Sequence, residues 1–122
     1  AQLLDALFYG STNEFSKIKI NYADDFGVTV VMASGGYPNK YVTGFKIKGI
    51  EKFNNLIDVE IFHSGTKCID DTIVTNGGRV LSITSRSSNL NDARKKNYEI
   101  VNKIKWENEY HRNDIAKNIL NK

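Results

Sequence analysis

The spacing of apolar and polar residues changes along the chain from a helical period to a strand period. Apolar residues between positions 3 and 8 recur at helical spacing and are followed by Gly10-Ser11, which predicts the last turns of a helix over 3–9. The run at 28–33 is continuous, apolar and rich in β-branched residues, and it stops at two glycines and the only proline. This pattern predicts a buried strand that ends in a loop.

Shorter segments with period-two alternation predict further strands, separated by Gly-, Asn- and Asp-rich turns such as Ser64-Gly65-Thr66 and Asp70-Asp71. The predicted strands are 18–22 at an edge, 57–61 running on into Phe62-His63, 73–75 and 80–84. The longest helical pattern covers 90–106, with Asn89 as the N-cap, and a short turn is predicted at 115–120. Strands first and one long helix late predict an α+β fold: a small antiparallel sheet or partial β-barrel with a helix packed on it.

Length and composition fit one globular domain and narrow the classes of partner. The 122 residues include 17 Lys and Arg against 14 Asp and Glu, a net charge of +3 with the charges scattered. A net positive charge this small is compatible with binding an anionic small molecule or a nucleic acid. The single cysteine, Cys68, excludes an internal disulfide framework and a four-cysteine zinc site, and suits a reducing compartment. No segment approaches the roughly 18 apolar residues of a membrane-spanning helix.

Two glycine pairs are candidates for ligand contact. Gly35-Gly36 leave the buried strand just before Tyr37-Pro38, and a loop without Cβ atoms lets backbone N–H groups approach an anion. The same pair also fits a plain tight turn that needs positive φ. Gly77-Gly78 follow Asn76, so a simple β-turn is one interpretation. The other is that the turn delivers Arg79 beside exposed backbone donors, a good receptor for phosphate or carboxylate.

The remaining polar residues favour structural roles in this segment. His63 has no second His or Cys near it, so it is a poor metal ligand and is more typical of a hydrogen-bonded structural residue. The acidic pairs lie in turns, where Asp is expected for backbone reasons. We therefore predict no catalytic residue and no metal ligand within this segment. The basic positions of the late helix are typical of a solvated face.

Five short motifs occur in the order found in one enzyme family. They are Val31-Met32-Ala33-Ser34-Gly35-Gly36-Tyr37-Pro38, Phe62-His63-Ser64-Gly65-Thr66, Thr75-Asn76-Gly77-Gly78-Arg79-Val80-Leu81, Leu90-Asn91-Asp92-Ala93-Arg94 with Tyr98, and Tyr110-His111-Arg112-Asn113-Asp114-Ile115. Together they resemble the C-terminal domain of phosphoribosylamine–glycine ligase. The family usually has glycine where this chain has Ser82, and often Gly-Ser-Tyr where it has Asn39-Lys40-Tyr41.

The resemblance implies a larger enzyme than this chain. Such ATP-grasp ligases join glycine to phosphoribosylamine in the second step of purine biosynthesis, releasing ADP and phosphate. ATP and Mg²⁺ (or Mn²⁺) would be bound by upstream domains absent from this segment. We expect residues 1–10 to be the end of a helix that links from those domains. Residues 11–122 would be the substrate-side C-terminal domain of a cytoplasmic protein, without nucleic-acid or membrane contacts.

The resemblance also suggests substrate-binding residues, because phosphoribosylamine carries a phosphate. Arg79 is the first candidate, with Gly77 and Gly78 giving backbone room. Further candidates that line the cleft or hold its loops are Gly35, Gly36, Tyr37, His63 and Thr66. Two other interpretations remain: a free-standing anion-binding or scaffold domain without catalysis, and a nucleic-acid binder that uses the basic helix. The second of these would bind with steep salt dependence.

Overall fold

The computed structural model describes residues 2–12, 14–19, 21–53 and 56–119. The helices are α1 (Gln2–Ser11) and α2 (Leu90–Val101), with short 3-10 helices η1 (Phe15–Lys17) and η2 (Ile50–Lys52). The strands are β1 (Phe26–Ser34), β2 (Val59–His63), β3 (Thr66–Ile69), β4 (Thr72–Thr75), β5 (Arg79–Ser87) and β6 (Glu109–His111). The predicted α+β class is confirmed.

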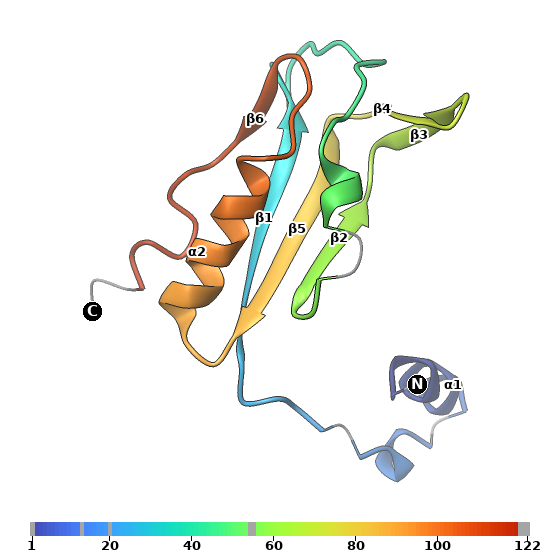
Figure 1. The fold of residues 1–122 in the computed structure, drawn as a ribbon. Helices are drawn as coiled ribbons and strands as arrows, with labels where there is room; N and C mark the ends of the chain where they lie inside the picture. Colours follow the sequence, from blue (N-terminus) through green and yellow to red (C-terminus); the bar gives the residue numbers. More distant parts are fainter. Residues whose placement is uncertain (1, 13, 20, 54–55, 120–122) are drawn as a thin grey trace.

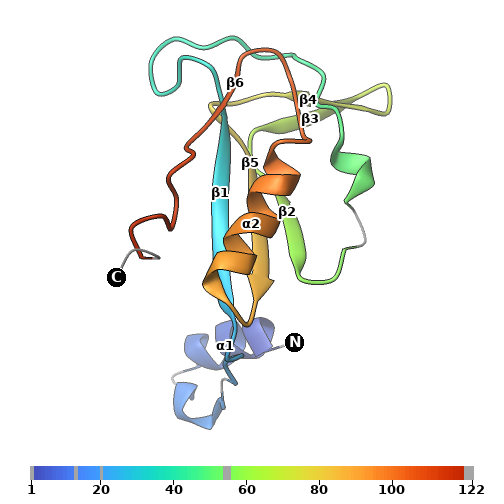
Figure 2. The ribbon, with the colours of Figure 1, turned by 60° about the vertical axis from the view of Figure 1, so that its left-hand side comes forward.

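An antiparallel sheet in the order β2-β5-β1-β6 carries α2 on one face, as Figures 1 and 2 show. β1 alternates between exposed and buried residues over most of its length, as expected for a strand with one face against a helix. In the centre of the sheet Val30 lies opposite Ile83, and Met32 opposite Leu81. These four side chains are fully buried with Val101 and Ile104 from the helical side, and together they form the core.

Two asparagines stabilise α2, one by capping its first turn and the other by bonding to the sheet. The side chain of Asn89 accepts hydrogen bonds from the backbone N–H groups of Asn91 (2.8 Å) and Asp92 (3.3 Å), so the predicted N-cap is confirmed. Buried Asn97 donates from its amide to the backbone carbonyls of Val28 (2.7 Å) and Ile83 (2.8 Å). The helix is thus tied by hydrogen bonds to β1 and β5 as well as packed on them.

The predicted end of the long helix is wrong. α2 stops at Val101 rather than at 106, because Lys105 forms a two-hydrogen-bond bridge with Lys48 (2.9 and 3.0 Å) that draws the chain out of the helical path. Ile104 and Trp106 still enter the core, from irregular backbone. The spacing of apolar residues alone does not distinguish a helix that runs to 106 from one that ends at Val101, since Ile104 and Trp106 would be buried in either structure.

Other element boundaries also differ from the sequence-based expectations. The described part of 18–22 forms no strand (Ile20 lies outside it), and β2 starts at Val59 because Asp58 adopts φ +67° in the preceding turn. Thr66 opens β3 instead of closing a turn, and β3 pairs with β4 as a separate hairpin. β6 was not predicted. The turn expected at 115–120 is present over 115–119, and position 120 lies outside the described residues.

The N-terminal helix stands apart from the sheet (Figure 1). The expected helix over 3–9 is confirmed and extends through Ser11. Its apolar residues Leu3, Leu4, Leu7 and Phe8 are exposed, each by 63% or more. The core of the domain therefore begins with β1.

Candidate functional site

Three of the motif loops meet at one end of the sheet because of its antiparallel topology. β1 and β2 both run antiparallel to β5, so the ends of β1 and β2 lie beside the start of β5 (Figure 1). Ser34 ends β1, His63 ends β2 and Arg79 begins β5. Segments as far apart in the sequence as Ser34 and Arg79 are thereby brought together.

Direct hydrogen bonds join these loops. Ser34 donates from its backbone N–H to the carbonyl of Gly78 and from its hydroxyl to the carbonyl of Gly77, both at 2.8 Å. The N–H of Asn76 donates to the carbonyl of Gly65 at 2.7 Å. A Cβ on Gly65 would lie 2.5 Å from the Arg79 carbonyl oxygen and 2.8 Å from the Gly77 Cα. The backbones therefore touch, and a side chain at Gly65 would separate them.

The ring of Tyr37 covers Gly78 next to Arg79. A Cβ on Gly78 would lie only 2.1 Å from Cδ2 of Tyr37, so the ring rests on the glycine backbone. The guanidinium carbon of Arg79 is 5.9 Å from the ring centroid, within cation–π range. The rings of Tyr37 and Tyr41 also meet in an edge-to-face contact, with centroids 5.9 Å apart. Gly78 thus allows the close approach that fixes Tyr37 beside the arginine.

Arg79 differs from the other three arginines of the chain in its electrostatic environment. Arg86 pairs with Asp58 (2.6 Å), Arg112 pairs with Asp114 (2.7 Å), and Arg94 donates to two backbone carbonyls. Within the described ranges, Arg79 has no carboxylate within ion-pair distance, and its side chain is exposed. Its positive charge is therefore available to an anionic ligand.

His63 and Thr66 hold the neighbouring loop. The Nδ1 atom of His63 lies 3.0 Å from the hydroxyl oxygen of Thr66, across the loop that contains Gly65. Thr66 in turn lies opposite Thr75 in the β3–β4 hairpin. The contact closes the loop whose glycine packs on Gly77. Both side chains lie at the same end of the sheet as Arg79.

The glycines after β1 line a cavity of about 630 Å³. Its walls are Gly35, Gly36, Tyr37, Asn108, Glu109 and Tyr110. The last three residues lie in and before β6, and sequence reasoning did not single them out as site residues. The available signal was Tyr110, which begins one of the family motifs. Strand pairing of Ser34 with Glu109 brings this segment to the glycine loop.

Glu109 carries two cationic or hydrogen-bonding partners at this cavity. Its Oε1 accepts from the Lys105 ammonium (2.6 Å) and its Oε2 lies 3.0 Å from Nδ1 of His111. The side chain of Glu109 is 12% exposed. Its carboxylate is therefore paired with Lys105, and it lies on the opposite face of β6 from the Tyr110 side chain.

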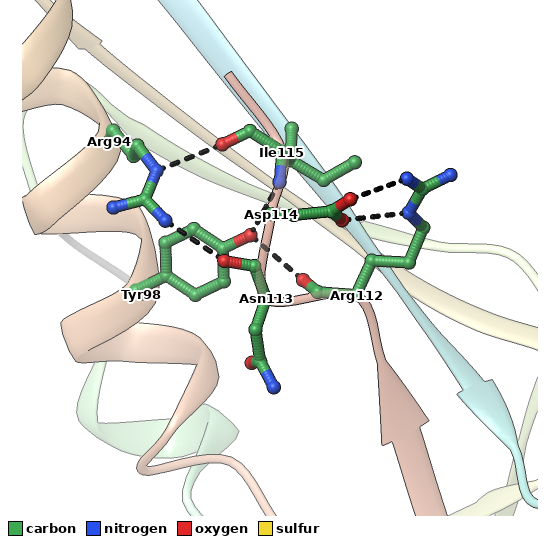
Figure 3. Close-up of polar contacts among 6 residues, drawn as sticks. All are labelled: Arg94, Tyr98, Arg112, Asn113, Asp114 and Ile115. Atoms are coloured by element: carbon green, nitrogen blue, oxygen red, sulfur yellow. Dashed lines mark hydrogen bonds and ion pairs between the residues drawn. The ribbon is translucent and has the colours of Figure 1, made fainter. Parts of the chain in front are cut away.

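The two remaining motifs interact with each other, as Figure 3 shows. The Tyr98 hydroxyl donates to the carbonyl of Arg112 (2.8 Å) and accepts from the N–H of Ile115 (3.1 Å). Arg94 lies over the Tyr98 ring, 4.7 Å from its centroid, and donates to the carbonyls of Asn113 and Ile115, both at 2.9 Å. These contacts of Arg94 and Tyr98, which we call the clamp, hold the segment after β6 against α2. They thereby support the cavity wall.

Charge pairing at the end of this clamp shifts two pKa values. Two hydrogen bonds from Arg112 hold the pKa of the Asp114 carboxyl below its ordinary value, and the carboxylate raises the pKa of Arg112.

Within the described ranges, no three His, Cys, Asp or Glu residues are grouped in a way that would hold a metal ion. None of the described helices is long and apolar enough to cross a membrane.

Comparisons with known proteins agree with the motifs. Residues 27–118 match the family described as "Phosphoribosylglycinamide synthetase, C domain". A "Bifunctional purine biosynthetic protein purD" of Dictyostelium discoideum is 44% identical over 105 residues, which cover 85% of this chain and 13% of that protein. A "Phosphoribosylamine--glycine ligase" of Fusobacterium nucleatum is 39% identical over 117 residues, covering 95% of this chain and 28% of the relative.

The fold has the same counterpart among solved structures. The crystal structure of a phosphoribosylamine–glycine ligase from Thermotoga maritima matches with a TM-score of 0.79 and 32% identity. The match covers 94% of this chain and 27% of that one. The chain thus spans little more than a quarter of the length of these ligases, and less of the bifunctional protein.

Proposed function

The chain belongs to the phosphoribosylglycinamide synthetase C-domain family, and we propose that it serves as the substrate-side domain of a phosphoribosylamine–glycine ligase. The complete protein would join glycine to phosphoribosylamine at the expense of ATP, giving glycinamide ribonucleotide, ADP and phosphate. The names of the relatives support this activity. The relatives named above do not favour the alternative of a free-standing anion-binding or scaffold domain.

We assign the phosphate of phosphoribosylamine to Arg79. The observation that carries this is its exposed guanidinium, which, unlike those of the other three arginines, has neither an ion-pair partner nor a hydrogen-bond acceptor among the described residues. A guanidinium binds phosphate through paired N–H donors, and its charge is worth most where no carboxylate competes. Gly77 packs on Gly65 and Gly78 lies under the Tyr37 ring, so the two glycines would act by holding the loop that leads into Arg79. His63 and Thr66 would hold the adjoining loop in shape.

The rest of the catalytic apparatus would lie outside this segment. ATP and Mg²⁺ (or Mn²⁺) would be bound by upstream ATP-grasp domains, as the resemblance to the ligase family implies. Residues 1–10 would end a helix that links from those domains, and 11–122 would form the C-terminal domain. The exposed apolar face of α1 fits such a linking role. We place the complete protein in the cytoplasm, since the single free cysteine suits a reducing compartment.

The test compares two arginine variants in the complete gene product that carries this domain. Arg79→Ala removes the proposed phosphate contact, and Arg86→Ala is the matched control, an exposed arginine at the other end of β5. We expect Arg79→Ala to raise KM for phosphoribosylamine about tenfold to a hundredfold, the loss of one charge-assisted hydrogen-bonding group. KM for ATP should not change, and Arg86→Ala should leave both constants near wild type.

If Arg79→Ala and Arg86→Ala have the same KM for phosphoribosylamine, Arg79 does not bind this substrate. Arg79 would then be a structural residue or a contact to another domain. A complete protein that binds phosphate but forms no product would favour the scaffold alternative.

A further inference from the structure

The helix α2 covers one face of the four-stranded sheet (Figures 1 and 2), and we call the opposite face the open face. In β1, Val30 and Met32 are buried on the side of α2. The alternating residues Thr29, Val31 and Ala33 therefore point to the open face. Residues directly opposite one another on neighbouring strands share a face, so the register of the sheet assigns their partners to the open face as well.

This register brings Arg79 and several apolar side chains to one end of the open face. Ala33 lies opposite Arg79 on one side and opposite Tyr110 on the other. In the next row along the sheet, Phe62 and Val31 lie on either side of β5. The arginine that we assign to the substrate phosphate thus shares a face with three apolar or aromatic side chains.

The exposure of these three side chains is unusual for the outer face of a sheet. An antiparallel sheet with one face in water normally alternates apolar residues inside with polar residues outside. The row that contains Thr29 and Thr84 follows this rule, and the two hydroxyl oxygens lie 2.8 Å apart. Val31, Phe62 and Tyr110, which we call the open-face patch, break it and are 42%, 54% and 58% exposed. Exposed apolar residues grouped beside a polar rim are typical of a surface that contacts another part of a protein.

We propose that the ATP-binding domains of the complete protein pack against the open-face patch. The proposal rests on the function proposed above, because it takes those domains to belong to the same polypeptide. The related ligases are long enough to contain them. This chain covers 28% of the Fusobacterium nucleatum relative and 27% of the Thermotoga maritima chain, so most of each ligase lies outside the matched segment.

The position of Arg79 favours the same occupant. A phosphoribosylamine with its phosphate on Arg79 must bring its amine to the place where ATP drives the joining of glycine. That place would lie in the ATP-binding domains, so those domains must face the surface that carries Arg79. The open-face patch borders the arginine on this surface, whereas the row of Thr29 and Thr84 lies farther along the sheet and is polar enough to stay in water.

Cysteine labelling of the complete gene product tests this contact directly. Val31→Cys and Phe62→Cys are made one at a time in a Cys68→Ser background, and Lys95→Cys, at an exposed position of α2, is the control. The rate of reaction with a maleimide in the native protein is divided by the rate in urea, and peptide mass spectrometry identifies the labelled site. We expect this ratio to be at least about tenfold lower for Val31→Cys and Phe62→Cys than for Lys95→Cys, because labelling would require the domains to separate. Similar ratios at all three positions would overturn the proposal.

A charge placed in the patch gives a second measurement. Phe62→Glu should raise the labelling ratio of Val31→Cys toward that of the control, because a carboxylate in an apolar contact loses its hydration. Thr29→Glu is the matched control, an exposed position on the same face in the polar row, and it should leave the ratio low. Equal effects of the two glutamate substitutions would contradict a contact centred on the patch.

Labelling does not depend on catalysis, so failure of the contact and failure of the proposed function are distinguishable. Rapid labelling in a protein that forms glycinamide ribonucleotide would reject the contact and leave the function in place. Slow labelling in a protein that forms none would support the contact and reject the ligase. Protection that disappears on dilution of the protein would show that a second copy covers the patch, and would overturn the proposal.

Discussion

Replacing Gly78 by alanine tests whether the ring of Tyr37 rests on the glycine backbone. The new Cβ would lie 2.1 Å from Cδ2 and 2.5 Å from Cε2 of the ring. Carbon atoms in contact are normally about 3.5–4.0 Å apart, so the ring must move by more than 1 Å or the backbone must shift. The φ of Gly78 lies outside the left-handed region, and alanine is therefore compatible with the backbone itself.

The expected magnitude follows from these two facts. Forcing an extra methyl into a packed site costs about 1–3 kcal/mol. A glycine-to-alanine change at a compatible backbone position stabilises by about 0.4–1 kcal/mol through the unfolded chain. We expect Gly78→Ala to lower the free energy of unfolding by about 1–2 kcal/mol, the difference of these terms. In a Tyr37→Ala background the clash is absent, and the same change should be neutral or stabilising.

Urea unfolding followed by circular dichroism measures this in a double-mutant cycle of Gly78→Ala and Tyr37→Ala. Gly27→Ala is the matched control, since a Cβ there meets no atom within 4 Å and its φ is also not left-handed. We expect a coupling energy of at least about 1 kcal/mol between Gly78 and Tyr37. An equal cost of Gly78→Ala with and without the tyrosine ring would refute the packing argument.

Two further predictions concern the clamp on the segment after β6. Tyr98→Phe removes the hydroxyl that bonds to Arg112 and Ile115, and so leaves the part-buried N–H of Ile115 without its partner. Thermal or urea unfolding should show that the free energy of unfolding falls by about 1–2 kcal/mol. An unchanged free energy of unfolding would mean that water replaces the hydroxyl. The lowered pKa of Asp114 means that its pairing with Arg112 stabilises the fold above the unfolded-state pKa and loses this effect as pH falls through the lower folded-state value. Carboxyl NMR titration should place the Asp114 midpoint below that of a free aspartate, and Arg112→Ala should restore it; an unchanged midpoint would contradict the pairing.

The elements that could be predicted from the sequence are those in which the local residue pattern matches the burial that the element has in the fold. The run ending at Ala33 is apolar and β-branched, and it is the central strand β1. Asn89 has the right side chain for an N-cap, and α2 starts there. The end of α2 was not predictable from spacing, because Ile104 continues the apolar pattern from a segment that has already left the helix to bridge Lys48.

The meeting of the motif loops has a similar explanation. Antiparallel strands of the predicted lengths place Ser34, His63 and Arg79 at one end of the sheet, so the motif loops come together. The wall formed by Asn108 and Tyr110 could not be predicted, because β6 is three residues long, polar and paired with a strand more than 70 positions away. Short edge strands carry no periodic signal, and their place is set by tertiary pairing.

The most direct test of the central claim is product formation by the complete gene product with ATP, glycine and phosphoribosylamine. ADP release and glycinamide ribonucleotide are measured together, with each substrate omitted in turn. The account predicts one ADP per ribonucleotide, and no ADP when either glycine or phosphoribosylamine is left out. ADP release that ignores phosphoribosylamine, or a well-folded complete protein that forms no ribonucleotide, would contradict the assignment of this domain to a phosphoribosylamine–glycine ligase.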